Sequence, residues 1–347
     1  MAAQMNDTEA AGFTAVMRLR ELAMSGAYAA TVRAAARLRV ADGIGDTPAT
    51  AEELAATVGA EPGTLLRLLR ALVAHGVLTE GPDGFAHTEA SRLLREDAPR
   101  SLRNMVLWAT EPWTWAVWGL LDQSVRTGKG VFQDVFGKEF FTYLHEDAPD
   151  SAEIFDRAMT ESSRLSAKTV ADVLDLDGAA TFADIAGGQG LVLATLLERH
   201  PRLRGTLLDL PDVIAGADGR LRPGGALAGR ATLLPADCRD SIPVKADFYL
   251  LKNILEWDDE STVTTLRNVR AAAPAGARVV VIENLVDGSP EMRFTTAMDL
   301  LLLLNVGGKK HTRAGLSALI ERAGLELGGV RQIGPYLHCF ESTVPAS

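Results

Sequence analysis

From Thr181 onward the chain alternates short apolar runs with helical segments, and this alternation constrains the fold more than any other feature. The apolar runs are TFADIAG, GTLLDL, ATLLPADC, ADFYLLKN, ARVVVIENLV and, nearer the C-terminus, PYLHCFEST. Helical segments such as LVLATLLERH and STVTTLRNVRAAA separate them. Strands that alternate with helices form a mostly parallel sheet with helices on both faces. The sequence therefore predicts a doubly wound, Rossmann-like α/β domain over residues 176–347.

The first hundred residues show a different pattern, typical of a winged helix. Residues 12–40 are rich in Ala, Leu and Arg at helical spacing and are expected to form two helices that break near Ser25-Gly26. Thr50 followed by Glu53 forms a capping box that opens a helix, and a second helix contains LLRLLRALVAHG. VLTEG-PDG-FAHT then predicts two strands around a turn. These elements indicate a winged-helix domain over residues 1–100.

Residues 101–175 are expected to be helical and to link the two domains. They contain two segments rich in aromatic residues, WATEPWTWAVW and VFQDVFGKEFFTYL. Large aromatic side chains bury much apolar area and serve as core residues more often than as a cage around a ligand. Both interpretations stay open for this segment.

The charge balance argues against nucleic acid as a partner. The formal net charge is −10, so the field over most of the surface repels phosphate backbones. The second helix of the winged helix offers only Arg67 and Arg70 among its leucines, a face suited to packing against protein. No signal peptide is visible, the two cysteines suit a reducing cytoplasm, and the leucine run at 300–304 is too short to span a membrane.

The segment from Asp184 to Gly190, DIAGGQG, carries the strongest chemical signal. It follows a predicted strand and opens a helix, where glycines let the backbone approach a ligand and free N–H groups point toward it. Asp209 ends the next strand, where a carboxylate can accept the hydroxyls of a ribose. Leu193 replaces the third glycine of the dinucleotide fingerprint, and Asp184 suits an amino-acid ammonium, which favours S-adenosylmethionine over NAD. A glycine turn that serves packing alone is the alternative.

Several motifs in order carry a resemblance over nearly the whole chain, from about Ala15 to Glu341. They are EELAATVGAEPGTLLRLLRAL with HGVL, DIAGGQG, LLDLP, PADC, YLLKNILEWDDE, VVVIENLV and MDLLLLLNVGG. With them the chain resembles the S-adenosylmethionine-dependent O-methyltransferases of plant phenolic and bacterial antibiotic pathways. Members of that family join a winged-helix dimerisation domain to a class I methyltransferase domain. The resemblance implies a homodimer, S-adenosylmethionine as cofactor and no metal.

The resemblance also implies a role for each matching position. The residues implied to contact the cofactor are Ala186, Gly187 and Gly188 at the methionine part, Asp209 at the ribose, Leu210, Asp237 and Cys238 around the adenine, Lys252 at the methionyl end, and Trp257. Those implied to border the acceptor pocket are Phe155, Met159, Asp299, Leu302, Leu303 and the aromatic cluster that includes Trp113.

The chain departs from the family pattern at the position of the general base. The family usually carries a His before an Asp-Trp pair, whereas this chain reads Lys252-Asn253-Ile254-Leu255-Glu256-Trp257 and has no His there. Three residues are the candidates to act instead. Glu256 lies at or beside the lost position, with a surface acid at a helix start as the alternative. Glu283, at the end of the predicted strand VVVIEN, is acidic like the residue that the family has there.

His311 is the third candidate, because an unperturbed His titrates near neutrality. Its alternative is a solvated loop residue. The preceding Lys309 and Lys310 are expected to be a solvated basic pair, with the binding of an anionic substrate group as the alternative. General base catalysis contributes about 10²–10⁴-fold, whereas positioning contributes about 7–11 kcal/mol. The sequence therefore predicts methyl transfer to a hydroxyl of an aromatic or polyketide-like secondary metabolite. The alternative keeps fold and cofactor but replaces methylation by hydroxylation, decarboxylation or pericyclic ring closure.

Overall fold

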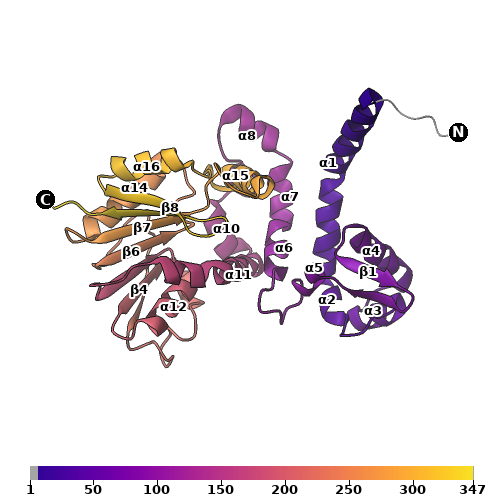
Figure 1. Ribbon diagram of the computed structural model, residues 1–347, viewed down its shortest axis with the longest axis horizontal. Helices are drawn as coiled ribbons and strands as arrows, with labels where there is room; N and C mark the ends of the chain where they lie inside the picture. The colour runs from indigo at the N-terminus through magenta and orange to yellow at the C-terminus, as the bar shows by residue number, and fades with distance from the viewer. Residues whose placement is uncertain (1–6, 347) are drawn as a thin grey trace. The chain divides into compact units, whose positions relative to one another are not determined.

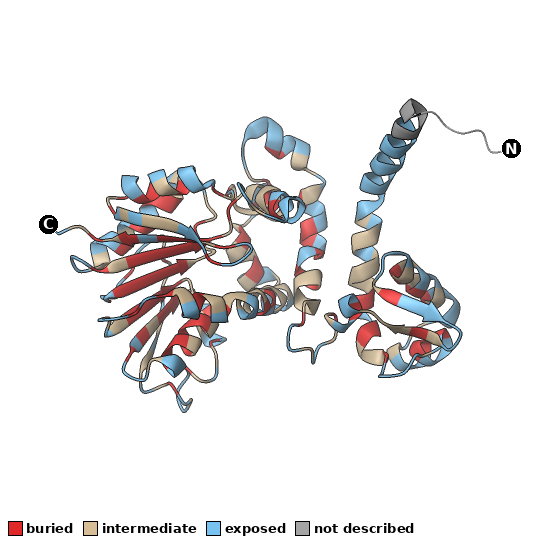
Figure 2. Ribbon diagram, viewed as in Figure 1, coloured by how far each residue is buried: buried red, intermediate tan, exposed pale blue. Residues whose placement is uncertain are grey.

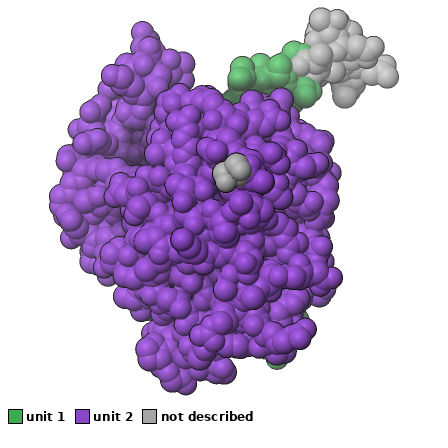
Figure 3. Space-filling view, turned by 90° about the vertical axis from the view of Figure 1, so that its left-hand side faces the viewer, with its two compact units in different colours: residues 1–111 green, residues 112–347 purple. Residues whose placement is uncertain are grey.

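The computed structural model describes residues 7–346. The chain divides into two compact units, residues 1–111 and residues 112–347 (Figures 1 and 3). Each unit has its own buried core. The first contains the winged helix and the second contains the large sheet.

The first unit is a winged helix, as the sequence predicts. Its elements are α1 (Asp7–Arg37), α2 (Val40–Gly43), α3 (Ala51–Val58), α4 (Pro62–Ala74), β1 (Leu78–Gly81), β2 (Gly84–His87), α5 (Glu89–Arg92) and α6 (Arg103–Ala109). The capping box is present, since the Glu53 N–H donates to Thr50 Oγ1 at 3.2 Å and the Thr50 N–H donates to Glu53 Oε2 at 2.8 Å. Strands β1 and β2 pair antiparallel around the predicted turn.

The expected break near Ser25-Gly26 is wrong, because α1 runs unbroken from Asp7 to Arg37. The Ser25 hydroxyl donates to the carbonyl of Leu22 at 2.7 Å, a bond that leaves the helical backbone in place. A glycine in a helix costs only about 1 kcal/mol relative to alanine. The alanine-rich flanks, which favour a helix, outweigh that cost.

Helix α4 packs its leucine face into the core of its own unit. Leu65, Leu69 and Leu72 are buried in the core of this unit. Arg70, one of its two arginines, forms an ion pair at 3.2 Å with Glu80 of β1. The leucine face is therefore used inside the domain, and Arg70 is held by an acid of its own unit.

The second unit begins with helices and continues into the sheet. Its helices are α7 (Pro112–Trp118), α8 (Leu121–Thr127), α9 (Phe132–Phe136), α10 (Phe140–Asp147), α11 (Pro149–Val173), α12 (Leu191–Arg199), α13 (Pro211–Ala215), α14 (Asp259–Ala272), α15 (Met292–Val306) and α16 (Arg313–Arg322). The helical character expected for the linking segment is confirmed. Within the described residues, no helix combines the length and the apolar character needed to cross a membrane.

The sheet has seven strands in the order β5-β4-β3-β6-β7-β9-β8. The strands are β3 (Thr181–Ile185), β4 (Arg204–Asp209), β5 (Ala231–Pro235), β6 (Phe248–Lys252), β7 (Arg278–Glu283), β8 (Glu326–Gln332) and β9 (His338–Thr343). The first five are parallel, and β9 is antiparallel to both β7 and β8. This is the predicted doubly wound sheet with one antiparallel edge.

Helices cover both faces of the sheet (Figure 1), and its central strands are buried (Figure 2). Successive residues of a strand point to opposite faces. Leu207 and Leu250 belong to a core with α11 and α12, whereas Leu208 and Leu251 belong to a core with α14 and α16. Strands buried on both faces read as continuous apolar runs, which is why the sequence reveals them.

We expect Thr50→Ala to lower the free energy of unfolding of the winged helix by about 1 kcal/mol, because the substitution removes the N-cap of α3. Urea unfolding followed by circular dichroism measures it. Thr57→Ala is the matched control, since this exposed threonine on the same helix only bonds its own helix, Oγ1 to the Glu53 carbonyl. Equal stability of the two variants would contradict the prediction.

Candidate active site

The candidate site lies at one edge of the sheet, where four parallel strands end. Asp209, Lys252 and Glu283 are the last residues of β4, β6 and β7, and the glycine loop follows β3. The chain moves outward from β3 to β5 and then returns to β6 beside β3. In open α/β sheets, ligands bind at such a switch point, outside the carboxyl ends of the strands.

Asp209 holds the glycine loop in shape. Its carboxylate accepts the N–H of Gly188 and the N–H of Leu210, each at 2.7 Å. Burial raises the pKa of Asp209 to about 6. Gly188 lies in the left-handed region at φ 62°, and a Cβ built on it would meet no atom within 4 Å. The loop therefore presents an open face at this edge of the sheet.

Gly187 and Asp184 occupy the closed side of the same loop. A Cβ on Gly187 would lie 2.5 Å from Cγ of Asp184 and 2.7 Å from Cδ1 of Leu207, so only glycine fits. Ala186 precedes it with φ 49°, a left-handed conformation unusual for alanine. The close approach of backbone to carboxylate is what keeps Asp184 beneath the loop.

Asp184 is 2% exposed, and its Oδ2 has no hydrogen-bond partner among the described residues. Burial raises its pKa to about 7, although the charge of Lys252 acts in the opposite direction. The Lys252 ammonium donates to Ser163 Oγ at 3.4 Å. A buried carboxylate oxygen without a partner is costly unless a donor completes it. S-adenosylmethionine carries an ammonium group that can donate to this oxygen. The Asp184 carboxyl and the open glycine loop therefore both fit this cofactor.

The residues implied at the adenine are drawn together by an arginine that the sequence reasoning missed. Arg239 donates to both carboxylate oxygens of Asp237, its shortest bond being 2.7 Å from Nη2 to Oδ2. Burial works against ionisation of Asp237, but these bonds outweigh it and hold its pKa below the ordinary value. The Arg239 guanidinium lies 5.9 Å from the ring centroid of Trp257. Burial raises the pKa of the Cys238 thiol to about 12, so it stays protonated, while Leu210 leads into α13.

Glu283 and Glu256 lie near each other but in different environments. Glu283 is 2% exposed, and its Oε1 accepts the N–H groups of Ile254 and Leu255 at 2.9 Å each. Burial and the nearby charge of Glu256 raise the pKa of Glu283 to about 8. Glu256 instead forms an ion pair with the ammonium of Lys310. Among the described residues, Glu256 has an ion pair and Glu283 has none, although the charge of Lys310 lowers the pKa of Glu283.

The segment after α15 differs from the solvated loop that was the alternative for His311. The Lys310 side chain is only 7% exposed, so the expectation of a solvated basic pair holds for Lys309 alone. His311 is 5% exposed, with Nε2 3.5 Å from Thr262 Oγ1 of α14. Burial lowers the pKa of His311. The segment is drawn inward because Glu256 supplies a charge partner for Lys310 and α14 supplies a packing surface for His311.

The residues implied at the acceptor pocket lie on three helices. Trp113 of α7 packs edge to face against Phe140 at 5.1 Å between ring centroids, and Phe140 packs against Phe155 of α11 at 6.0 Å. Met159, further along α11, is half-buried. Three others lie on α15, which packs against α7: Asp299, Leu302 and Leu303. The Asp299 carboxylate accepts the backbone N–H of Lys310 at 2.6 Å, which ties α15 to the segment that pairs with Glu256.

Helix α11 also contributes polar side chains that the sequence reasoning missed. Thr160 Oγ1 donates to Gln189 of the glycine loop at 3.0 Å, and Ser163 contacts Lys252. Burial, and then the charge of Asp209, raise the pKa of Asp156 to about 6. The three residues recur at the i, i+4, i+7 spacing of one helical face. That spacing indicates a shared helical face, but nothing in the sequence shows that this face lies against the glycine loop.

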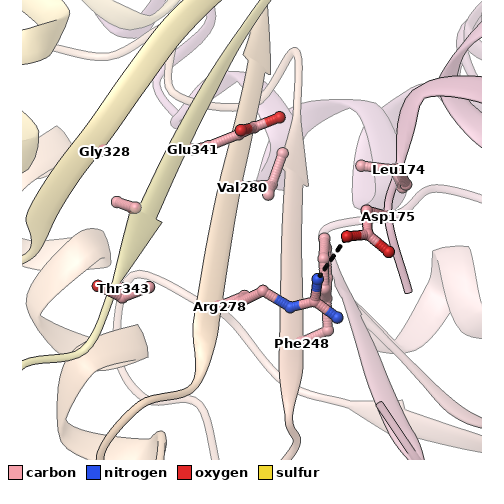
Figure 4. A pocket seen from close by; sticks show the side chains of 9 residues that line it. Leu174, Asp175, Phe248, Arg278, Val280, Gly328, Glu341 and Thr343 are labelled. Atoms are coloured by element: carbon pink, nitrogen blue, oxygen red, sulfur yellow. Dashed lines mark ion pairs between the residues drawn. The ribbon is translucent and has the colours of Figure 1, made fainter. Parts of the chain in front are cut away.

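A pocket of about 270 Å³ lies at the opposite end of the same strands (Figure 4). It is lined by Phe248 and Arg278, the first residues of β6 and β7. Arg278 already contacts Asp175 at 3.8 Å, as the dashed line shows, and the ring of Phe248 at 5.1 Å. These contacts tie the end of α11 to the sheet, so the pocket is separate from the candidate site. Among the described residues, no group of three His, Cys, Asp or Glu side chains could hold a metal ion.

The fold and the site define a doubly wound domain that binds a nucleoside cofactor. Comparison with known families identifies it further: residues 118–326 match the O-methyltransferase domain, and residues 21–97 match the O-methyltransferase dimerisation domain. The chain belongs to the O-methyltransferase family and is an S-adenosylmethionine-dependent O-methyltransferase.

Three similar proteins illustrate the relationship. The mitomycin biosynthesis 6-O-methyltransferase of Streptomyces lavendulae is 39% identical over 308 residues, covering 88% of this chain and 87% of the relative. The structure of the mitomycin 7-O-methyltransferase MmcR aligns with a TM-score of 0.87 and 36% identity, covering 96% and 99% of the two chains.

The third is NcsB1 from neocarzinostatin biosynthesis, whose structure holds S-adenosylmethionine and 2-hydroxy-5-methyl naphthoic acid. It aligns with a TM-score of 0.78 and 33% identity, covering 91% of this chain and 95% of the other. These likenesses confirm the expected cofactor and reaction. They do not favour the alternative of a repurposed, non-methylating enzyme.

We expect Gly187→Ala to weaken binding of S-adenosylhomocysteine at least tenfold, because the new Cβ displaces the Asp184 carboxylate. Overpacking of this kind costs about 1–3 kcal/mol, and tenfold corresponds to about 1.4 kcal/mol. Isothermal titration calorimetry measures the dissociation constant. Gly229→Ala, at a position where a Cβ meets nothing within 4 Å, is the control. Unchanged affinity of Gly187→Ala would show that the closed side of the loop does not matter for the cofactor.

Proposed function

We propose that the chain methylates a hydroxyl of an aromatic or polyketide-like secondary metabolite. The observation that carries the proposal is the meeting, at one sheet edge, of the open glycine loop, the unpartnered Asp184 oxygen and the buried acid Glu283. Trp113 of α7, Phe140 of α10 and Phe155 of α11 pack together beside that edge and form an apolar surface, the aromatic border. S-adenosylmethionine supplies a methyl group on a sulfonium, and the similar protein NcsB1 binds a naphthoic acid, 2-hydroxy-5-methyl naphthoic acid, together with S-adenosylmethionine.

We propose that the site residues divide as follows. The cofactor would be held by the glycine loop, from Asp184 to Gly188, by Asp209 and Leu210 at the end of β4, by Asp237, Cys238 and Trp257 at the adenine, and by Lys252. The acceptor would be bordered by Trp113, Phe155, Met159, Asp299, Leu302 and Leu303. The acceptor's proton would pass to a carboxylate oxygen of Glu283.

Glu283 is the best of the three candidate bases on physical grounds. Glu256 forms an ion pair with the Lys310 ammonium, so its carboxylate is already bound to a cation. The two ring nitrogens of His311 lie near polar groups of α14, Nε2 at 3.5 Å from Thr262 Oγ1 and Nδ1 at 3.9 Å from Asp259 Oδ1. The pKa of Glu283, about 8, lies close to the working pH, where a general base is most effective. Positioning by the aromatic border would supply the larger part of the rate enhancement.

We propose a cytoplasmic homodimer without a nucleic-acid partner. Helix α1 exposes apolar side chains along its length, among them Phe13 at 60% and Leu19 at 69% exposed. Exposed apolar area on this scale favours a protein partner, and the matched dimerisation domain favours a second copy of the chain. The two buried, free cysteines suit a reducing compartment.

Incubation of the protein with S-adenosylmethionine and a panel of phenols and hydroxynaphthoic acids tests the reaction by mass spectrometry. We expect equimolar S-adenosylhomocysteine and a product heavier by one methylene. Aliphatic alcohols serve as the negative control, since they offer no ring for the aromatic border. A product without S-adenosylhomocysteine would contradict methyl transfer, and equal turnover of aliphatic alcohols would contradict the aromatic acceptor.

We expect Glu283→Gln to lower kcat/KM by about 10²–10³-fold, because the amide cannot accept the proton. A base must be deprotonated to act, so the wild-type kcat/KM should rise with pH and level off above a pH of about 8. The variant should lose this rise. Glu326→Gln, at the exposed first residue of β8, is the control. A Glu283→Gln profile that keeps both rate and rise would assign the base elsewhere.

The variant Glu256→Gln tests which of the two neighbouring carboxyl groups causes the pH dependence of kcat/KM. The negative charge of Glu256 raises the pKa of Glu283, so its removal lowers that pKa. We therefore expect the rise in kcat/KM to persist in this variant but to move to lower pH. If the rise disappears instead, Glu256 rather than Glu283 is the group that titrates.

A further inference from the structure

Arg239 lies between two acids that come from distant parts of the chain. Its Nε and Nη2 donate to the carboxylate of Asp237, two residues earlier, at 2.7–3.1 Å. Its Nη1 donates to Glu139 Oε1 at 2.8 Å. The planar guanidinium presents its donors in a fixed fork, so one arginine can hold both acids at once.

The backbone around Arg239 is fixed to the sheet domain. The side-chain amide of Asn268, on α14, donates to the carbonyls of Cys238 and Arg239 at 3.0 and 2.9 Å. The guanidinium also lies over Trp257, 5.9 Å from the ring centroid. Arg239 is thus anchored among the residues proposed to border the adenine.

Glu139, the other acid, belongs to the helical segment. It is the residue before α10, and Phe140, the first residue of that helix, packs against Trp113 and Phe155. Near the other end of α10, His145 Nδ1 lies 3.8 Å from Asp212 of α13. Helix α10, which carries the centre of the aromatic border, is therefore linked to the cofactor side of the domain by the Glu139–Arg239 ion pair, and its other end lies close to α13.

We propose that Arg239 is a positioning residue that links the cofactor site to α10, so that an occupied cofactor site orders the aromatic border of the acceptor pocket. This inference rests on the proposed function, because it uses Asp237 and Trp257 as cofactor residues. It adds an order of events: the acceptor pocket is complete only after the cofactor has bound.

Solvent exposure explains why the link responds to the cofactor. The side chains of Arg239 and Glu139 are 33% and 40% exposed. An ion pair so exposed contributes little to stability, since water screens it. A ligand seated against Asp237 and Trp257 removes water from one side of the guanidinium. Because the attraction between charges grows as water is excluded, the bond to Glu139 strengthens and α10 is held more firmly.

Hydrogen–deuterium exchange of the full-length protein tests the link without any turnover. Peptides that cover residues 139–147 are followed with and without S-adenosylhomocysteine, whose binding is measured separately by calorimetry. We expect saturating S-adenosylhomocysteine to slow exchange in this segment by about fivefold or more, the lower end of ordinary coupling between sites. In Glu139→Gln the affinity should stay within about threefold, but the protection should be lost.

Arg239→Met should lose the same protection even at saturating ligand. Arg220→Met is the matched control, because Arg220 also donates to an aspartate two residues earlier, Asp218, and to a glutamate, Glu198, yet has no contact with α10 in the described structure. Wild-type protection of 139–147 in Glu139→Gln would overturn the link while leaving the cofactor site intact. Failure of wild-type protein to bind S-adenosylhomocysteine would overturn the cofactor site and the link with it.

Discussion

The hydrogen bonds that Asp209 accepts from Gly188 and Leu210 are the constraint on which the site depends. They join the loop after β3 to the end of β4, and so give the glycine loop one shape. In that shape Gly187 lies against the Asp184 carboxylate with no room for a side chain. The buried charge beneath the loop and the open face above it are therefore two results of one backbone arrangement.

The strands that carry the site were predictable because burial on both faces leaves a continuous apolar signal. Runs such as FYLLK of β6 and RVVVIE of β7 have this property. Strand β8 escaped prediction because it is an edge strand with two glycines, an irregular register between Leu327 and Gly329, and partly exposed side chains. Helix α1 was divided in error because a Ser-Gly pair is a weak breaker where alanines surround it.

Part of the site could be placed from sequence because Asp209 and Glu283 end apolar runs and Asp184 lies one residue before the end of another, and parallel strands end at one edge. The contacts of Arg239 and Lys310 could not. Arg239 and Glu139 are 100 residues apart, and Lys310 and Glu256 are 54 apart, so no local pattern joins them. Such pairs are decided by tertiary packing, and single charged residues in loops look alike in sequence whether they are solvated or buried.

The missing histidine has a physical consequence for the acceptor. Where a neutral imidazole would take the proton, this chain has a buried acid, Glu283, whose pKa is about 8. Proton transfer to it from a simple phenol, whose reference pKa is about 10, is uphill. A hydroxyl on a conjugated or carbonyl-bearing ring ionises more readily and removes that difference. The buried Lys310 paired with Glu256 limits the negative charge around Glu283, the proposed base, so with this base the site is best matched to an acceptor whose hydroxyl is more acidic than phenol.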